Sequence, residues 1–437
     1  MEIGLFGIHG LLDKMVHVAM KTVRYSPLDK AQTVIASLVL GCAHPKAIND
    51  TLGEESAAAN YLGKDRWPDQ SQINRYLTRF TPTNVDELGA VHERLLRQES
   101  RARHACGLIV ADIDQCGLVA DGQTYEFHRK GYVPHKRGRE GYQLSLAYIG
   151  AYEETVALYL DPGNVHCKDR LPALLRALDR LFGPDDTAIA LLRRLDAGYD
   201  SAPNRALLAG LPGYVLLKGA QPDLATRLGC AVPLQDWLPL ANGVHGVEMA
   251  PDASGLRRLV YELHQADGAV DYALLYTNLP ADAWTASQLF ALYNDRATIE
   301  AFFCASRHVY NIKSLRSRKF HAIYAFLCFV ALTHNLLHWT KQARLARPDL
   351  AADVQAEGDD VEDDAAASLD LARATTRQLV SYAARVRAQV QWDGRWHVQI
   401  LRPRARSSRW AALLIAALIP PPQPVQLALP FARLHKT

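Results

Sequence analysis

Three acidic residues, Asp114, Asp196 and Glu300, stand where the sequence pattern changes. The first two follow apolar stretches typical of buried strands, and the third lies in a segment with helical periodicity. They can act together only if the fold brings them to one place. Converging carboxylates with few other donors suit Mg²⁺ or Mn²⁺, which keep positions for water and phosphate. Two such ions, about 4 Å apart, would support an in-line phosphoryl displacement.

The elements that must position two of these carboxylates are predicted strands. Residues 107–114 predict a strand whose end carries Asp112 and Asp114, on the same face at a period of two. Residues 187–195 predict another strand, which stops at Asp196. Ligands of open α/β sheets bind beyond the carboxyl ends of strands. We therefore expect a joint metal site there, with Asp114 preferred over Asp112 as the catalytic residue and with Asp112 as a further metal ligand.

Glu300 belongs to a third predicted element, which starts at Tyr293. At about 100° per residue, Tyr293, Arg296, Glu300 and Arg307 fall within an arc of roughly 60° on one helix face. An apolar stripe lies beside them. One helix is therefore predicted, with a core edge and an edge bearing a phenol, two guanidinium groups and a carboxylate. The alternative is an exposed stripe in which Arg296 and Glu300 form an i,i+4 pair of small energy.

The composition is that of an ordinary soluble globular protein with room for two or three domains. The 437 residues are 49% hydrophobic and 22% charged, and seven scattered cysteines without CxxC spacing indicate a reducing cytosol. The first residues lack the pattern of a signal peptide, and the apolar run 322–333 is too short to cross a bilayer. Eight acidic residues between 353 and 370 leave a net charge of +11 elsewhere, against +3 overall. A basic body is compatible with a polyanionic partner.

The order of patterns predicts an α/β protein with flanking regions. Residues 1–104 are expected to form a helical domain, 105–345 a mixed-sheet domain with a β-rich insertion at about 219–272, 346–370 an acidic linker, and 371–437 a C-terminal region with a β-hairpin around Asp393-Gly394. Predicted strands of the middle domain, besides the two above, are 124–128, 142–149, 155–160, 213–218, 259–264 and 272–277.

The predicted helix 69–80 carries side chains that can contact DNA. Asn74 is of the type that pairs with adenine, and Arg75 and Arg79 are of the type that contacts guanine or phosphate. The segment could be the recognition helix of a helix-turn-helix. The polar outer face of a small helical bundle is an equally common explanation.

Taken together, these motifs resemble the bacterial cut-and-paste DDE transposases of insertion sequences. The signature of that group is Tyr, two residues, Arg, three residues, Glu, six residues, Lys, and here it is Tyr293, Arg296, Glu300 and Arg307, with Arg for the final Lys. Asp-Ile-Asp-Gln-Cys at 112–116 resembles the first Asp motif, with Cys116 where a hydroxyl residue is usual. Asp-Ala-Gly-Tyr at 196–199 resembles the second.

The resemblance implies an RNase H-like core and two-metal catalysis of DNA cleavage and strand transfer. Asp114, Asp196 and Glu300 would hold Mg²⁺ or Mn²⁺, while Tyr293, Arg296 and Arg307 would hold the DNA strand. Tyr272 stands near the place of a Trp that stacks on a flipped base in relatives. The expected partners are terminal inverted repeats, target DNA and a second copy of the chain. The expected location is the bacterial cytoplasm, at the nucleoid when DNA is bound, and no membrane is involved.

Two other functions remain open from the sequence. An RNase H-like nuclease could cut DNA without transferring strands. A regulator derived from a transposase could bind DNA with its metal site unused, although the three retained carboxylates argue against this.

Overall fold

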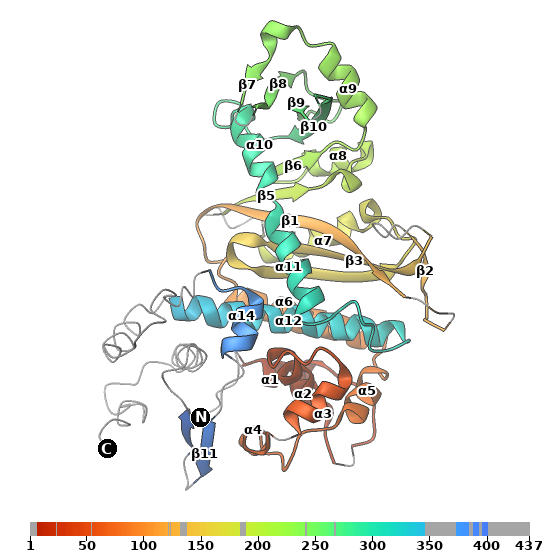
Figure 1. The fold of residues 1–437 in the computed structure, drawn as a ribbon, viewed down its shortest axis with the longest axis vertical. Helices are drawn as coiled ribbons and strands as arrows, with labels where there is room; N and C mark the ends of the chain where they lie inside the picture. Colours follow the sequence, from red (N-terminus) through yellow and green to blue (C-terminus); the bar gives the residue numbers. More distant parts are fainter. Residues whose placement is uncertain are drawn as a thin grey trace, which may run out of the picture. The chain divides into compact units, whose positions relative to one another are not determined.

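The computed structural model describes residues 7–22, 24–53, 55–120, 122, 124–131, 138–183, 189–240, 243–265, 268–345, 373–383, 388–392 and 396–400. Contacts divide the chain into two units, which are described separately below (Figure 1). The helical unit comprises Met1–Leu95 and Ala305–Thr437, and the sheet unit comprises Leu96–Cys304.

The helical unit forms from amphipathic segments with strong start signals. Ser26 caps the second helix through a reciprocal capping box with Asp29, and Pro27 occupies its first turn. The helices of this unit are α1 (Ile8–Met15), α2 (Pro27–Val39), α3 (Pro45–Leu52), α4 (Ser56–Tyr61), α5 (Gln70–Leu77), most of α6 (Pro82–Glu99), α12 (Phe320–Leu345) and α14 (Thr376–Gln378). Helices α1 to α6 agree with the predicted helical domain 1–104, and α5 coincides with the predicted helix 69–80.

Helix α12 is the core of the helical unit. It packs against α2 and α5. Its part Phe320–Ala343 is long and apolar enough to cross a membrane, with a mean hydropathy of 1.6, but 83% of the most apolar stretch is buried inside the protein. A helix that is apolar all round and buried by its neighbours is typical of a globular core. The sequence pattern assigns this segment to the end of the middle domain, and within the helical unit it contacts α2, α5 and α14.

The sheet unit contains one mixed sheet of ten strands, in the order β2-β3-β1-β5-β6-β10-β9-β8-β7, with β4 also paired to β3 (Figure 1). Strand β1 runs antiparallel to β3 and parallel to β5, and β5 runs parallel to β6. The strands are β1 (Gly107–Val119), β2 (Arg129–Lys130), β3 (Glu140–Ile149), β4 (Glu154–Pro162), β5 (Ile189–Leu195), β6 (Tyr214–Lys218), β7 (Leu238–Pro239), β8 (His245–Met249), β9 (Arg257–His264) and β10 (Val270–Thr277).

Five helices complete the sheet unit. They are α7 (Cys167–Leu181), α8 (Ala202–Ala209), α9 (Pro222–Cys230), α10 (Ala286–Asn294) and the greater part of α11 (Ala297–His308). Helix α7 packs against β1, β3 and β4, and α9 packs against β9 and β10. The central strands are accordingly apolar and buried, as in β3, where nine consecutive residues from Gly141 are buried.

One prediction about this unit needs correction. Residues 124–128 form turns rather than a strand, because Phe127 has a left-handed backbone (φ 56°) that no strand accommodates. The segment predicted as a β-rich insertion contains β7, β8 and β9, and β9 pairs with β10, which pairs with β6, so that these strands extend the main sheet. Helix α9 also lies within this segment.

The C-terminal hairpin is confirmed for the part that the structure describes. Strand β11 (Ala388–Trp392) pairs antiparallel with β12 (Trp396–Ile400), ending in the pair Trp392–Trp396. Its predicted turn at Asp393-Gly394, the acidic linker 346–370 and the residues beyond 400 lie outside the described residues.

Candidate active site

Asp114 and Asp196 lie side by side because of the register of two parallel strands. The last registered pair of β1 and β5 is Ile113 with Leu195, and each aspartate is the next residue of its strand. Strand β1 continues to Val119, so Asp114 lies within it and not at its end as the sequence predicted, but the parallel pairing stops at Ile113. The structure thus brings together two carboxylates that are far apart in sequence.

The pKa of the Asp114 carboxyl is shifted by its burial and by the charges around it. Burial raises its pKa to about 6, the Arg296 guanidinium opposes that rise, and Asp196 adds to it. Arg296 Nη2 lies 2.9 Å from Asp114 Oδ2. Two carboxylates in a partly buried setting disfavour each other's charge. A divalent cation between them would relieve that cost.

Asp196 is fixed by a short 3₁₀ turn that follows β5. Its Oδ1 accepts a hydrogen bond from the Gly198 amide at 3.0 Å, which caps residues Ala197–Tyr199. The Cys167 thiol donates to the Gly198 carbonyl at 2.9 Å. Burial, with Asp196 next, raises the pKa of Cys167 to about 12, so this thiol stays protonated and acts as a donor. No local sequence pattern indicates this role of Cys167.

A buried hydroxyl without a partner lies at the same place. Tyr199 is completely buried, and its hydroxyl makes no hydrogen bond with any residue that the structure describes. Burial raises the pKa of this phenol well above its usual value, and Asp114, Cys167 and Asp196 raise it further. The phenol therefore lies near the carboxylates. A hydroxyl donor and two acidic oxygens fit a hydrated Mg²⁺ or Mn²⁺, whose coordinated waters accept and donate hydrogen bonds.

Asp112 has a different environment from Asp114. Its two oxygens accept hydrogen bonds from Arg194 Nε at 2.6 Å and Nη2 at 2.9 Å, and both side chains are buried. Thr298 donates to Asp112 Oδ2 at 3.1 Å. With both oxygens engaged by Arg194 and one of them also by Thr298, this carboxylate has few acceptor sites left for a metal ion. The geometry argues against the prediction that Asp112 is a metal ligand, and Arg194 is a partner that the sequence analysis missed.

Arg194 also determines where the following helices meet. Besides Asp112, it donates to the carbonyl of Leu292 and, at 3.1 Å, to that of Asp295, both at the C-terminal end of α10. Helix α10 ends at Asn294 and α11 begins at Ala297, so Asp295 and Arg296 form a turn between two helices. The prediction of one continuous helix from Tyr293 is wrong, because the carbonyls that would continue it are bound to Arg194.

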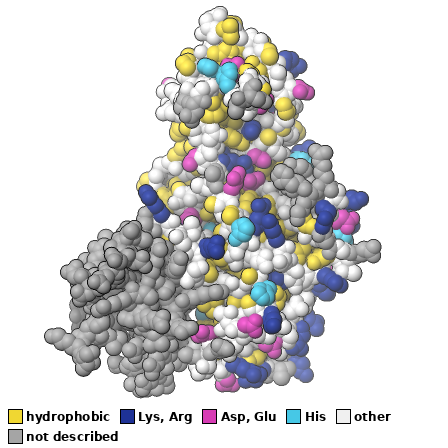
Figure 2. All heavy atoms as spheres, in the orientation of Figure 1, with side chains coloured by type: hydrophobic (Ala, Val, Ile, Leu, Met, Phe, Trp, Pro, Cys, Tyr) yellow, Lys and Arg dark blue, Asp and Glu magenta, His cyan; other side chains and the backbone are white. Residues whose placement is uncertain are grey.

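The turn places Tyr293 and Arg296 against the two aspartates. Arg296 also donates to the Ile113 carbonyl at 3.5 Å. Burial lowers the pKa of this guanidinium, but Asp114 and Asp196 more than compensate. Burial raises the pKa of Tyr293 to about 12, with Arg296 and Asp196 as its next strongest neighbours. On the face shown in Figure 2, acidic and basic side chains lie next to one another where α10 meets α11.

Glu300 is not brought into these contacts. Glu300 lies exposed in the first turn of α11, and among the described residues no hydrogen bond or ion pair involves it. Arg307 is partly buried in the last turn of the same helix. Because of the break at Asp295–Arg296, the single helix face that was predicted to carry all four side chains does not exist.

The start of α11 lies very close to the sheet. A Cβ atom on Gly150 would come within 2.2 Å of Thr298 Oγ1 and 2.6 Å of its Cβ. Only glycine allows this approach. Gly150 therefore helps to define where Arg296 and Glu300 stand relative to Asp112 and Asp114.

The remaining predicted DNA contacts lie elsewhere. Asn74, Arg75 and Arg79 are exposed on or just after α5, whose opposite face buries Ile73 and Tyr76. Tyr272 on β10 packs against Trp237 at 6.1 Å between ring centroids, and a Cβ on Gly229 would lie 2.3 Å from its ring. This packing argues against a free stacking platform at Tyr272.

The chain matches a known protein family over the region that carries this site. Residues 110–336 match the family described as Transposase DDE domain, which is more than half of the chain. This protein belongs to the DDE transposase family. It is accordingly a phosphoryl-transfer enzyme of DNA transposition, and divalent metals are the general cofactors of its family. No curated protein matches the sequence.

Proposed function

We propose that this transposase cleaves DNA at terminal inverted repeats and joins the 3′ ends to target DNA, with Asp114, Asp196 and Glu300 as metal ligands. The observation that supports it most is the juxtaposition of Asp114 and Asp196 beside Arg296 and Tyr293. The order β4-β3-β1-β5-β6 supports an RNase H-like core, in which three antiparallel strands are followed by two parallel ones.

Two divalent ions would supply activation of a water or 3′-hydroxyl and neutralisation of the leaving oxygen. Asp114 and Asp196 would hold them from the sheet, and Glu300 would join from α11. Tyr293 and Arg296 would bind the strand at the scissile phosphate. Arg307 retains the charge of the usual lysine, with a forked geometry that grips phosphate through two donors.

Glu300 is the part of this proposal that the free protein supports least, and it is also the easiest to test. DNA from the flanks of the gene, carrying the element's own ends, serves as substrate in Mg²⁺. We expect Glu300→Gln to bind these ends as the wild type does and to cut them at least about a thousandfold more slowly, a loss of roughly 4 kcal/mol in transition-state stabilisation.

The matched control is Asp295→Asn, at an exposed residue five positions away whose hydrogen bonds to the described residues are made by its backbone alone. It should cut at nearly the wild-type rate. Cleavage by Glu300→Gln at the wild-type rate would refute the assignment of Glu300. Cleavage by the wild type without joining to target DNA would identify a nuclease instead.

Two further parts of the proposal concern assembly and end recognition. We propose a homodimer on paired ends in the bacterial cytoplasm, with α5 reading the repeats. Arg75 is exposed and holds only a 3.4 Å contact to the Ser71 carbonyl, so it is free to meet a base. Light scattering of the protein with and without end DNA measures the dimer: one copy per end in a complex of two ends supports it.

A further inference from the structure

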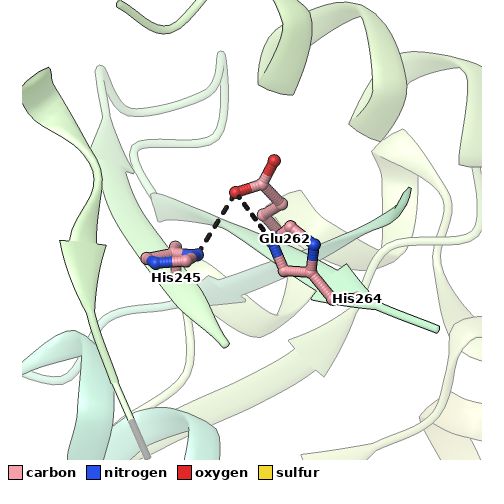
Figure 3. Close-up of side chains that lie close together, drawn as sticks. All are labelled: His245, Glu262 and His264. Atoms are coloured by element: carbon pink, nitrogen blue, oxygen red, sulfur yellow. Dashed lines mark ion pairs between the residues drawn. The ribbon is translucent and has the colours of Figure 1, made fainter. Parts of the chain in front are cut away.

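A second group of ligand-type side chains lies away from the carboxylates, on strands β8 and β9. His245 stands directly opposite Glu262 in the register of these antiparallel strands, and His264 lies two residues beyond Glu262 on the same face. One ligand atom from each residue lies within 4.8 Å of the other two. Figure 3 shows both imidazole rings turned toward the Glu262 carboxylate.

The distances within this group are unusual for ion pairs. His245 Nδ1 and His264 Nε2 lie 3.3 Å and 3.5 Å from the same oxygen, Glu262 Oε2. A charge-assisted N–H···O bond is typically about 2.7–2.9 Å long. By contrast, the pair of His128 and Glu140 in the same unit is 2.7 Å long. Both imidazole rings therefore lie near the same carboxylate oxygen, at distances longer than a charge-assisted hydrogen bond.

The separations match the edges of a metal coordination shell. Tetrahedral Zn²⁺ binds imidazole nitrogen and carboxylate oxygen at about 2.0–2.2 Å, which places neighbouring ligand atoms roughly 3.3–3.5 Å apart. In addition, His245 Nδ1 is a buried nitrogen with no hydrogen-bond partner among the described residues, although Glu262 Oε2 lies 3.3 Å away. An unpartnered nitrogen aimed at a carboxylate oxygen is what a metal ligand looks like before the ion binds.

We infer that His245, Glu262 and His264 form a binding site for a Zn²⁺-type ion. The donor set of two imidazoles and one carboxylate suits Zn²⁺ and discriminates against Mg²⁺, which prefers oxygen ligands. His264 is about half exposed, with 47% of its side chain accessible, so water completes the shell from the solvent side. The site is separate from the carboxylates of the proposed function and does not depend on them.

The ion would tie two strands near one edge of the sheet. Beyond β8 lies only β7, whose two residues make a weak edge. The two strands β8 and β9 carry the three proposed ligands, and Tyr272 stands opposite Glu262 on β10, the other neighbour of β9.

Titration of the metal-free protein with Co²⁺, followed by visible absorption, tests the inference. The host is the double variant Asp114→Asn/Asp196→Asn, so that the other carboxylate pair contributes no ion. We expect one equivalent of Co²⁺ with the strong absorption of a tetrahedral site, displaced by Zn²⁺. His264→Ala and Glu262→Gln should weaken binding roughly tenfold or more, and His128→Ala, from the ordinary pair, should not change it.

Thermal unfolding in Zn²⁺ gives an independent readout with the full wild-type chain. Zn²⁺ should raise the unfolding temperature of the wild type and of His128→Ala, but not that of Glu262→Gln. The inference is overturned if the Co²⁺ spectrum is absent or octahedral, or if Glu262→Gln binds as tightly as its host. It is also overturned if the only change in the variants is lower stability in metal-free buffer, which would identify an ion pair alone.

Discussion

Two aspartate–arginine pairs stand two residues apart on strand β1, and their environments differ sharply. Asp112 and Arg194 are both buried and joined by two hydrogen bonds. Asp114 and Arg296 are each less than one-fifth exposed and joined by one contact of 2.9 Å, with a second carboxylate beside them. The first pair is complete in itself, whereas the second leaves acidic oxygens available. The buried structural carboxylate Asp112 and the proposed metal ligand Asp114 therefore differ in their partners, although their sequence surroundings are alike.

Removal of Arg194 from its buried pair with Asp112 should lower the free energy of unfolding more than any other change considered below. Arg194→Met leaves the Asp112 carboxylate buried with only Thr298 as a partner, and removes the donors that hold the end of α10. Loss of one member of a buried pair costs about 3–5 kcal/mol. We expect a fall of that size in the free energy of unfolding, measured with urea.

The corresponding change in the other pair, Arg296→Met, removes a partner of a carboxylate that is already partly protonated near neutral pH. It should lower the free energy of unfolding by less than half as much. Equal losses in the two variants would remove the distinction between the pairs.

The pH dependence of stability tests whether Asp114 has a raised pKa in the folded protein. The pKa of Asp114 is raised from 3.8 to about 6 in the folded protein, so the folded state binds its proton more tightly than the unfolded state. This contribution to stability is complete below about pH 4 and is lost as pH rises through about 6. We expect Asp114→Asn to abolish that fall, which unfolding curves between pH 4 and 7 would show. An identical fall in Asp114→Asn would assign it to other groups.

The same shift predicts the pH dependence of metal binding. Protons and divalent ions compete for the Asp114 oxygens, so Mn²⁺ should bind more tightly as pH rises from 5 to 7. Electron paramagnetic resonance of free Mn²⁺ measures this, and Asp114→Asn should show a flatter dependence. A pH-independent affinity in the wild type would contradict the raised pKa.

A smaller effect concerns the approach of α11 to the sheet. Gly150→Ala places a methyl group against Thr298 and should cost about 1–3 kcal/mol of stability, together with slower DNA cleavage. Gly89→Ala is the control, because a Cβ there meets no atom within 4 Å and glycine in a helix is unfavourable. That variant should be as stable as the wild type or slightly more so. Equal stability and equal cleavage rates of the two variants would show that the contact between Gly150 and Thr298 leaves room for a methyl group.

The smallest expected effect is on end recognition. Arg75→Ala should reduce discrimination between cognate and scrambled end DNA by about 1–3 kcal/mol, measured by fluorescence anisotropy at fixed salt. The same discrimination is measured for Arg79→Ala as a comparison, because Arg79 lies beyond the last turn of α5. Equal losses on both DNAs would mean that Arg75 contacts phosphate only.

The sequence predicts much of the fold because its strongest signals are local. Apolar runs such as those of β3 and β5 and the capped start of α5 are visible without tertiary information. The meeting of Asp114 and Asp196 was also predictable, since each was expected at the end of a buried strand and parallel strands carry such residues to one edge.

The parts that could not be predicted depend on contacts between distant residues. Arg194 lies in an apolar strand, and nothing local shows that it pairs with Asp112 or that it ends α10 at Asn294. Residues 293–300 suit a continuous helix by propensity, and only the loss of two carbonyls to a guanidinium breaks it. Likewise, the pattern of a single strand does not specify which strand it pairs with, so the pairing of β10 with β6 could not be predicted.

The most direct test of the central claim is single-turnover cleavage of end DNA in Mg²⁺ by Asp114→Asn, with unfolding measured on the same preparation. If Asp114 is the reactive carboxylate and Asp112 the structural one, Asp114→Asn will be at least as stable as the wild type at pH 7 and will show no detectable cleavage. Cleavage at the wild-type rate by this well-folded variant would contradict the account.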